Sequence, residues 1–577
     1  MHLNDSIGLE TRLEYVCCHH EQACAMAAEG YARVSGKPGI VCVTTGPGGI
    51  NALNGVFGAW TDSIPMLVIS GQVKRETCMA ACRLSSLRQL GDQEADIIPM
   101  VQGITKYSVM VEDPATIRYH LEKALHLAVS GRPGPCWVDI PLDVQGSPIE
   151  PETLVGYTPE EEAHDDDVLC AQCDETLERL AKAKRPVLLV GTGIHLAVAE
   201  ADFDRVIQRL GIPVVTAWTA HDLMDSADPL ACGRPGTIGD RAGNFTVQNA
   251  DLLLVIGSRL NIRQVSYNWS SFARQAFKIQ VDIDACELDK PTVKPDLPIV
   301  ADAKRFLLTL ERRLDALGDA TQHNATRHGA WVAWCRERVE RYPVVLPNHR
   351  QPANGRINPY HFVEALFERL RDDDVIVCGN GSACVVPFQA GAIKKGQRMF
   401  ANSGCASMGY DLPAAIGAAV ARGGRRVICL AGDGSLMMNV QELQTLAGLG
   451  LPVLVFVFNN QGYVSIRLTQ NAFFKGRHMG SGPDSGVSFP DFVHLGEGFG
   501  LPARRLDGPD FAQGLDAILS SAGPMLVDVS LDPLQGFEPK LSSRQLDDGS
   551  IVSPCLEDMY PFLSQQELQD NILTAEK

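Results

Sequence analysis

The chain has 577 residues, of which 45% are hydrophobic and 21% charged, so it is neither disordered nor fibrous and is long enough for roughly three or four domains. Lys and Arg number 51 against 69 Asp and Glu, and the net charge of −18 argues against nucleic-acid binding as the main task. The longest apolar run, 451–458, is far shorter than the ~20 residues that span a bilayer, and the first ten residues lack a secretory pattern. We therefore expect a cytoplasmic protein with neither a nucleic-acid nor a membrane partner.

The cysteines do not follow a metal or disulfide pattern. There are 17 of them, an odd number, scattered through the chain. The CxxC pair Cys170 and Cys173 has no second pair and no histidines at the spacing of a zinc site. We expect reduced thiols that pack as small hydrophobic side chains.

The first part of the chain, residues 1–150, alternates short apolar runs that end in Gly or Pro with Ala-rich or amphipathic stretches. The strands expected there are 36–49, 64–72 and 132–144. The helices expected there are 20–34 and 117–129. This alternation predicts a mostly parallel sheet joined by crossover helices. The acidic stretch 155–167 then predicts a linker.

Two further units of the same kind follow, which we bound at 168–335 and 355–540. The strands expected in the second unit are 185–193, 212–218, 251–259 and 277–284, before a helical segment over 303–338. The strands expected in the third unit are 375–382, 425–434, 451–460 and 523–531, after an irregular region over 341–359. Residues 541–577 form a C-terminal arm. The predicted fold class is α/β, with three domains that each contain a mostly parallel sheet flanked by helices.

The most informative segment is 430–463. Asp433 follows one apolar strand within Gly-Asp-Gly-Ser, and Asn460 follows the next within Asn-Asn. Ligands of open α/β sheets bind beyond the carboxyl ends of the strands. A carboxylate, an amide oxygen and a backbone carbonyl are ligands that suit Mg²⁺, and the glycines allow a diphosphate to approach the backbone. A Gly-Asp-Gly turn alone is common, but the two motifs together, each after a buried strand, are more specific.

These two motifs at this interval resemble those of the thiamine diphosphate (ThDP) enzymes, in particular the acetolactate (acetohydroxyacid) synthase branch, and the resemblance covers essentially the whole chain. The resemblance implies Mg²⁺ held by Asp433, Asn460 and the carbonyl of Gly462. It implies further cofactor contacts at Gly381, Ser382, Ala406, Met408, Gly432, Gly434, Ser435 and Tyr463. Met408 would support the cofactor in a bent conformation, and the Ala406 carbonyl would hold its amino group.

A glutamate near the start of the chain carries the catalytic part of the resemblance. Taken alone, Glu21 would be a charge in the first turn of a helix. The sequence HEQACAMAAEGYAR around it resembles the family motif whose glutamate relays a proton to the aminopyrimidine ring, and this implies that role for Glu21. The loop TTGPGGINALNG is similar to the family loop beside the pyrimidine. The residues implied on this side are Gly46, Pro47, Gly48 and Asn51, with Gln93 lining the active site.

The middle unit resembles the flavin-binding domain of acetohydroxyacid synthases through GSRLNIRQ at 257–264. The implied FAD contacts are Arg234, Gly236, Gly257, Arg259, Arg263, Asp282, Ile283, Asp302 and Ala303. Arginines suit a diphosphate because they bind it through two parallel hydrogen bonds. FAD would be structural, since acyl transfer from pyruvate involves no net redox step. The alternative is a vestigial domain with surface ion pairs, and VGTGIH at 190–195 lacks the third glycine of a dinucleotide motif.

The activity implied is decarboxylation of pyruvate and transfer of the resulting hydroxyethyl carbanion to a ketone or 2-keto-acid acceptor. Asp92, Ser465 and Thr469 stand where biosynthetic members carry Phe, Met and Trp, which suggests a larger and more polar acceptor site. Acetyl transfer to a nucleotide-linked keto-sugar in branched-sugar biosynthesis is therefore one alternative. An aldehyde-releasing 2-keto-acid decarboxylase and a noncatalytic ThDP-binding subunit are two others.

The two halves of the implied site lie in different domains. In the family they come from different subunits, which implies a homodimer or homotetramer with the site between subunits. The family also carries a helix, a strand and a Gly-rich loop before the Glu21 motif. Because the chain starts at MHLNDSIG, we expect the first domain to be N-terminally short.

Overall fold

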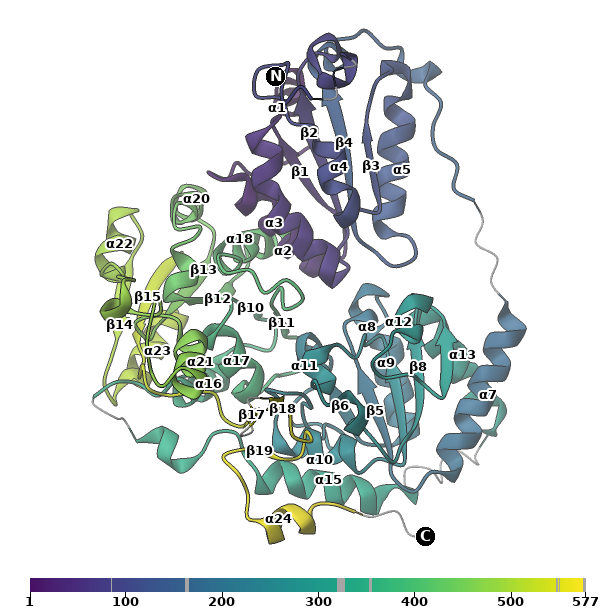
Figure 1. The fold of residues 1–577 in the computed structure, drawn as a ribbon, viewed down its shortest axis with the longest axis vertical. Coiled ribbons are helices and arrows are strands. Elements are labelled where there is room, and N and C mark those ends of the chain that lie inside the picture. The colour runs from purple at the N-terminus through teal and green to yellow at the C-terminus, as the bar shows by residue number, and fades with distance from the viewer. Residues whose placement is uncertain are drawn as a thin grey trace.

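The computed structural model describes residues 1–82, 84, 86–160, 165–318, 327–351, 355–545, 548 and 550–573. Three parallel sheets, each flanked by helices, form three successive bodies along the chain (Figure 1). The predicted fold class is confirmed. No helix among the described residues is long and apolar enough to cross a membrane.

The first sheet has four parallel strands in the order β1-β2-β4-β3. The strands are β1 (Gly39–Val43), β2 (Met66–Gln72), β3 (Tyr107–Met110) and β4 (Pro135–Pro141). The helices are α1 (His2–Leu9), α2 (Glu21–Ser35), α3 (Pro47–Asp62), α4 (Ile97–Val101), α5 (Ile117–Val129) and α6 (Leu142–Gln145). Every residue of β4 is buried, because helices cover both faces of a parallel sheet. The edge strand β3 was not predicted, since its residues are only half-buried and form no apolar run.

The central sheet has five parallel strands in the order β6-β5-β7-β8-β9. They are β5 (Pro186–Val190), β6 (Val214–Thr216), β7 (Leu252–Ile256), β8 (Phe277–Asp282) and β9 (Leu297–Val300). The helices are α7 (Asp166–Lys182), α8 (Gly193–Leu196), α9 (Glu200–Leu210), α10 (Arg241–Gln248), α11 (Ile262–Val265), α12 (Ala285–Asp289), α13 (Ala303–Ala316) and α15 (Gly329–Arg341). The direction in which strands are added reverses between β5 and β7, and such reversal points are where α/β sheets bind ligands.

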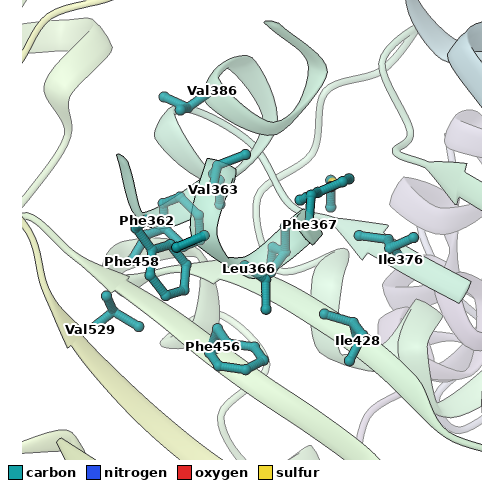
Figure 2. Packing of buried hydrophobic residues seen from close by; sticks show 14 of the residues in the cluster. Phe362, Val363, Leu366, Phe367, Ile376, Val386, Ile428, Phe456, Phe458 and Val529 are labelled. Carbon is teal, nitrogen blue, oxygen red and sulfur yellow. The ribbon is translucent and has the colours of Figure 1, made fainter. Parts of the chain in front are cut away.

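The third sheet has six parallel strands in the order β11-β10-β12-β13-β15-β14. They are β10 (Val375–Cys378), β11 (Arg398–Phe400), β12 (Val427–Gly432), β13 (Val453–Asn459), β14 (Ala503–Leu506) and β15 (Met525–Ser530). The helices are α16 (Pro359–Arg369), α17 (Ser382–Ala390), α18 (Asp411–Ala421), α19 (Asp433–Leu436), α20 (Glu442–Leu449), α21 (Val464–Phe473), α22 (Phe492–Gly498) and α23 (Phe511–Leu519). Figure 2 shows one face of this core, where Phe362 of α16 packs on Phe456 and Phe458 of β13.

The C-terminal segment runs back to the central domain, in yellow below α10 and α15 (Figure 1). It contains β16 (Lys540–Leu541), β17 (Arg544–Gln545), β18 (Ile551–Val552), β19 (Met559–Tyr560) and α24 (Gln565–Asp570). Gln248 of α10 donates to the Glu557 carboxylate over 2.6 Å, and Asn249 donates to the Asn571 carbonyl over 2.9 Å. These buried hydrogen bonds attach the arm to the second domain.

The first and third domains pack through helices α2 and α18. A β-carbon on Gly30 would lie 2.2 Å from the Ala414 carbonyl oxygen, so the two backbones are in direct contact. Ahead of α2, the Glu442 carboxylate accepts the backbone N–H groups of His19 and His20 over 3.0 and 3.1 Å. The start of α2 is thereby held against the third domain.

Candidate active site

The structure brings the Gly-Asp-Gly and Asn-Asn motifs together. Strands β12 and β13 are neighbours, with Gly432 paired with Phe458, so Asp433 and Asn460 emerge at the same edge of the sheet. One carboxylate oxygen of Asp433 accepts the N–H of Gly462 over 2.8 Å, and the other accepts the N–H of Gly434 over 2.7 Å. The Asp433 carboxylate is therefore fixed beside the second motif.

This site has the properties of a cation site. Asp433 is buried, and burial raises the pKa of its carboxyl to about 6. The Asn460 amide nitrogen donates to the Ser382 hydroxyl over 2.9 Å, and the amide oxygen takes no part in that bond. No group of three or more His, Cys, Asp or Glu within the described residues is arranged to hold a metal. The oxygen donors at Asp433 and Asn460 fit Mg²⁺, which takes its remaining ligands from phosphate and water.

The neighbouring loops leave space for a phosphate group. Gly381 precedes α17 with a φ of +62°, and a β-carbon built on it meets nothing within 4 Å. Gly434 accommodates the ring of Tyr463, which would lie 2.2 Å from a β-carbon there. The Ser435 hydroxyl accepts the N–H of Gly409 over 2.8 Å. The open N-terminus of α17 offers backbone N–H groups to an anion.

The loop that contains Ala406 and Met408 is attached to the same region. The Asn380 side chain donates to the Ser407 carbonyl over 2.5 Å, between these two residues. Ala406 has a φ of +57°, an uncommon conformation for a residue with a β-carbon. Met408 is half-buried. With Gly381, Ser382, Gly432–Ser435, Asn460, Gly462 and Tyr463, these residues form what we term the diphosphate cluster.

A second group of sequence-predicted residues gathers in the first domain, and we term it the pyrimidine cluster. Glu21 is the first residue of α2, and its carboxylate accepts the Asn51 amide over 3.1 Å. A β-carbon on Gly48 would lie 3.5 Å from the other carboxylate oxygen of Glu21. Gly46, with a φ of +55°, lies against the Gln93 carbonyl, which would be 2.0 Å from a β-carbon there. Pro47 begins α3 between these contacts.

The two clusters lie in different domains, and hydrogen bonds connect these domains. Ser407 donates to the Asn54 side chain over 2.5 Å, and Gly404 donates its N–H to Asp62 over 3.1 Å. In the part of the chain that the structure describes, no hydrogen bond joins Glu21 directly to Asp433 or to its neighbours. The structure thus places the two groups of residues in separate domains, with these contacts between the domains.

The central domain contains a cavity of about 460 Å³ at the reversal point between β5 and β7. Six of the nine predicted flavin residues line it: Gly257, Arg259, Asp282, Ile283, Asp302 and Ala303. A β-carbon on Gly191 would lie 2.3 Å from the Gly257 carbonyl oxygen. Glycines therefore keep the floor of the cavity free of side chains. The volume of the cavity, its glycine-lined floor and the Arg259 guanidinium fit a dinucleotide.

The other three predicted flavin residues lie off this cavity. The Arg234 guanidinium donates to the carbonyls of Phe388 and Gly391 over 2.9 and 2.6 Å, at the end of α17. Gly236 donates its N–H to the Asn244 side chain over 2.8 Å, and a β-carbon on Gly236 would lie 3.0 Å from the Arg263 carbonyl oxygen. These residues connect loops and domains in the structure.

Several cavity residues were missed by sequence reasoning. Gly191, Thr192 and Gly193 line the cavity, and the signal for them was present in VGTGIH, where two glycines follow a buried strand. Arg132 comes from the first domain and pairs with Asp284 and Glu287 over 2.8 and 3.0 Å. Ser403 comes from the third domain. No local pattern marks residues that other domains contribute.

Three parallel sheets, with Asp433 and Asn460 beyond the ends of β12 and β13, define a three-domain α/β protein with a candidate cation site in its third domain. Models of the thiamine pyrophosphate enzymes match the chain over residues 1–98 (N-terminal TPP binding domain), 173–310 (central domain) and 379–529 (C-terminal TPP binding domain). The chain belongs to the thiamine pyrophosphate enzymes, as the sequence motifs predicted.

Within the family the chain is acetolactate synthase-like. It is 33% identical to the acetolactate synthase large subunit of Parasynechococcus marenigrum, over 92% of this chain and 82% of that protein. It is 32% identical to the large subunit from Lactococcus lactis, over 93% and 89% of the two chains. It is also 32% identical to the isozyme 2 large subunit of Escherichia coli, over 91% and 90%. The predictions of a ThDP-dependent enzyme and of this branch are confirmed.

Proposed function

We propose that this enzyme decarboxylates pyruvate and joins the resulting two-carbon unit to a second carbonyl compound, as an acetolactate synthase does. The observation that carries the proposal is the 2.8 Å hydrogen bond between Asp433 and the N–H of Gly462. This bond joins the Gly-Asp-Gly motif to the segment that follows the Asn-Asn motif. The similarity to acetolactate synthases over about nine-tenths of the chain supports the same reaction.

Asp433, Asn460 and the Gly462 carbonyl would hold Mg²⁺, and the metal would hold the diphosphate of ThDP. When bound, ThDP supplies an electron sink that stabilises the carbanion left by loss of CO₂. Asp433 contributes a carboxylate already fixed by two backbone N–H groups, so little reorganisation is needed for binding. Gly381 and the N-terminus of α17 would donate backbone N–H groups to the phosphate oxygens.

Glu21 would hold the proton that is exchanged with the cofactor ring. Asn51 fixes one oxygen of its carboxylate, and the other lies 3.5 Å from the β-carbon position of Gly48. Gln93 is held by the contact of its carbonyl with Gly46 and would face the substrate. The chain's own groups thus place a proton at one end of the site and a metal at the other.

We infer that the complete site forms between two copies of the chain, in a homodimer or homotetramer. Ile50, Phe57 and Trp60 lie along one face of α3, next to the pyrimidine cluster, and are 44%, 42% and 37% exposed. Met437 and Met438, which follow the Gly-Asp-Gly-Ser motif, are 38% and 44% exposed. Exposed apolar groups beside both clusters favour burial against another subunit.

We also infer that the central cavity binds FAD as a structural group. Arg259 would neutralise its diphosphate, while Gly191, Gly193 and Gly257 would allow close approach of the backbone. The 17 free cysteines favour a reducing compartment, the cytoplasm.

A nucleotide-linked keto-sugar is a second candidate for the acceptor substrate. Ser465 and Thr469 are exposed on successive turns of α21, directly after the metal motif, and both are small and polar. Arg467 of the same helix donates to the carbonyls of Asn460 and Gln461 over 2.9 and 2.8 Å. Small polar groups at this rim leave room for a larger acceptor than a keto acid, and this favours acetyl transfer to a nucleotide-linked keto-sugar as the alternative.

Product analysis tests both candidates. The enzyme, with Mg²⁺, ThDP and FAD, is given pyruvate alone, pyruvate with 2-oxobutanoate, or pyruvate with a nucleotide-linked keto-sugar, and the products are identified by mass spectrometry. We expect a branched hydroxyketone and release of CO₂. Acetaldehyde as the sole product would instead identify a decarboxylase, and absence of CO₂ release would identify a noncatalytic subunit. A sugar adduct formed in preference to acetolactate would favour the alternative acceptor.

A further inference from the structure

A second cavity, of about 320 Å³, lies between the central and third domains, apart from the flavin cavity and both clusters. We term it the interdomain cavity. Its wall includes β6, the C-terminal half of α15, and the end of α17 with the residues after it. Its volume is at the lower end of the 300–1,000 Å³ typical of small-molecule sites.

Positive charge exceeds negative charge on this wall. Three guanidinium groups, of Arg234, Arg336 and Arg350, face two carboxylates, of Asp240 and Glu364. Glu364 is already paired with Arg350 over 2.6 Å. Arg336 donates to the Ala231 carbonyl over 2.7 Å and, among the described residues, has no carboxylate within 4.0 Å.

Arg234 adds a second cation that is compensated only in part. Its guanidinium bonds to carbonyl and hydroxyl oxygens, while the Asp240 carboxylate accepts the Arg234 backbone N–H over 2.9 Å. Burial lowers the pKa of Arg234 to about 10, and the nearby Asp240 opposes that shift. The wall therefore retains about one unit of positive charge in excess.

A buried imidazole offers a polar atom that the protein leaves unused. His221 is 2% exposed, and its Nδ1 is bonded to the Thr216 hydroxyl over 2.8 Å. Its Nε2 is buried and has no hydrogen-bond partner among the described residues. Burial and the adjacent Arg234 hold the pKa of His221 well below its usual range, so the ring is neutral. An unpaired buried polar atom is unfavourable, and a ligand that hydrogen-bonds to it would remove that cost.

Aliphatic side chains of modest size form much of the rest of the wall, beside the polar groups of Thr216, Ser226, Tyr342 and Gln389. Met224, Val339, Val344, Val345 and Ala390 line it. Because one net positive charge lies among short aliphatic side chains, the cavity matches a monoanion with a small branched body better than a dianion. This distinguishes an organic carboxylate from inorganic phosphate.

We propose that the interdomain cavity is a binding site for a small branched organic carboxylate, with Arg336 as its ionic partner and His221 as a hydrogen-bond partner. The site is separate from the catalytic clusters and does not depend on the proposed reaction. It connects with them through α17, whose last carbonyls bond to Arg234 and whose first residue, Ser382, bonds to Asn460.

Isothermal titration of the enzyme loaded with Mg²⁺ and ThDP tests this inference. The probe is 2-methylpropanoate, which has no keto group and so cannot react. We expect saturable binding that weakens at least about tenfold in Arg336→Gln, because an ionic hydrogen bond is lost. Arg341→Gln is the matched control, since Arg341 lies on the same helix, is exposed, bonds to Glu567 and does not line the cavity. It should bind as the unmodified enzyme does.

Three results would overturn the proposal: no saturable binding, equal binding by Arg336→Gln, or tighter binding of inorganic phosphate than of the carboxylate. His221→Asn provides a second variant and should weaken binding several-fold. If this buried substitution prevents folding, the binding measured for Arg336→Gln still tests the proposal, because Arg336 is half-exposed on a surface helix. Binding at the catalytic clusters would be insensitive to both variants.

Discussion

Gly417 of α18 lies so close to Ala27 of α2 that a β-carbon on Gly417 would be 1.8 Å from the Ala27 carbonyl oxygen. This contact joins the third domain to the helix that begins at Glu21. Because backbone rather than side chain forms it, the helices cannot adjust by changing a rotamer. The position of Glu21 relative to the third domain therefore depends on a residue without a side chain.

Substitution of Gly417 by alanine should destabilise the enzyme. We expect Gly417→Ala to cost about 1–3 kcal/mol, as overpacking does elsewhere, and to lower the melting temperature. Gly448→Ala is the control, because Gly448 is also helical but a β-carbon there meets nothing within 4 Å. That change should be neutral or stabilising by roughly 0.4–1 kcal/mol. Equal melting temperatures for the two variants would contradict the close contact.

Glu21→Gln should separate binding from catalysis. The amide keeps the shape of the carboxyl but cannot exchange a proton, so we expect turnover of pyruvate to fall about 10²–10⁴-fold. ThDP affinity, measured by quenching of protein fluorescence, should change little. Glu14→Gln, at an exposed position before α2, should behave as the unmodified enzyme. Unchanged turnover in Glu21→Gln would refute the proton-relay role.

Asp433→Asn should weaken the binding of metal and cofactor together. Loss of the carboxylate removes the one negative charge among the three proposed ligands, and we expect at least about a tenfold higher Mg²⁺ requirement for ThDP binding. Chelation by EDTA should release ThDP from the unmodified enzyme, and added Mg²⁺ should restore binding. ThDP that stays bound in EDTA would show that the metal is not needed there.

Flavin content should depend on Arg259. Arg259→Gln removes the guanidinium that lines the central cavity, so the purified protein should contain less flavin per chain, as measured by absorbance near 450 nm. Arg313→Gln serves as a control in the same domain, because Arg313 is at the surface and pairs with Asp174 over 2.6 Å. A protein that never contains flavin, even when refolded with FAD, would support a vestigial domain.

Glu29 should make stability depend on pH. Its side chain is fully buried, one oxygen bonds to Arg33 over 2.6 Å, and the other has no hydrogen-bond partner among the described residues. Burial raises the pKa of Glu29 from 4.5 to about 7; Arg33 opposes this shift and Asp62 adds to it. The folded state thus prefers the protonated acid.

The stabilisation from Glu29 is complete below pH 4.5 and is lost as the pH rises to about 7, by an amount on the order of 3 kcal/mol. Glu29→Gln should flatten this part of the profile, so that its melting temperature changes less than that of the unmodified enzyme between pH 5 and pH 7.5. Parallel profiles for the two proteins would show that Glu29 is ionised throughout.

The strands that the sequence predicted are those with continuous apolar runs. β12 and β13 lie in the middle of a sheet and are buried on both faces, so their sequences are almost continuously apolar. β9 and β14 lie at sheet edges, where Pro298, Arg504 and Arg505 are tolerated, and neither was predicted. Edge strands are covered less and need no apolar run. The short β11 was missed for the same reason.

The sequence by itself determined the diphosphate cluster, because parallel strands present their carboxyl ends at one edge of a sheet. Two polar motifs, each after an apolar strand, must then meet, and Asp433 and Asn460 do. Only the tertiary structure decided which domains close around the two cavities. Arg132 and Ser403 reach the central cavity, and His221 and Arg336 reach the interdomain cavity, from distant parts of the chain. Their proximity results from the packing of whole domains, which leaves no periodicity or spacing in the local sequence.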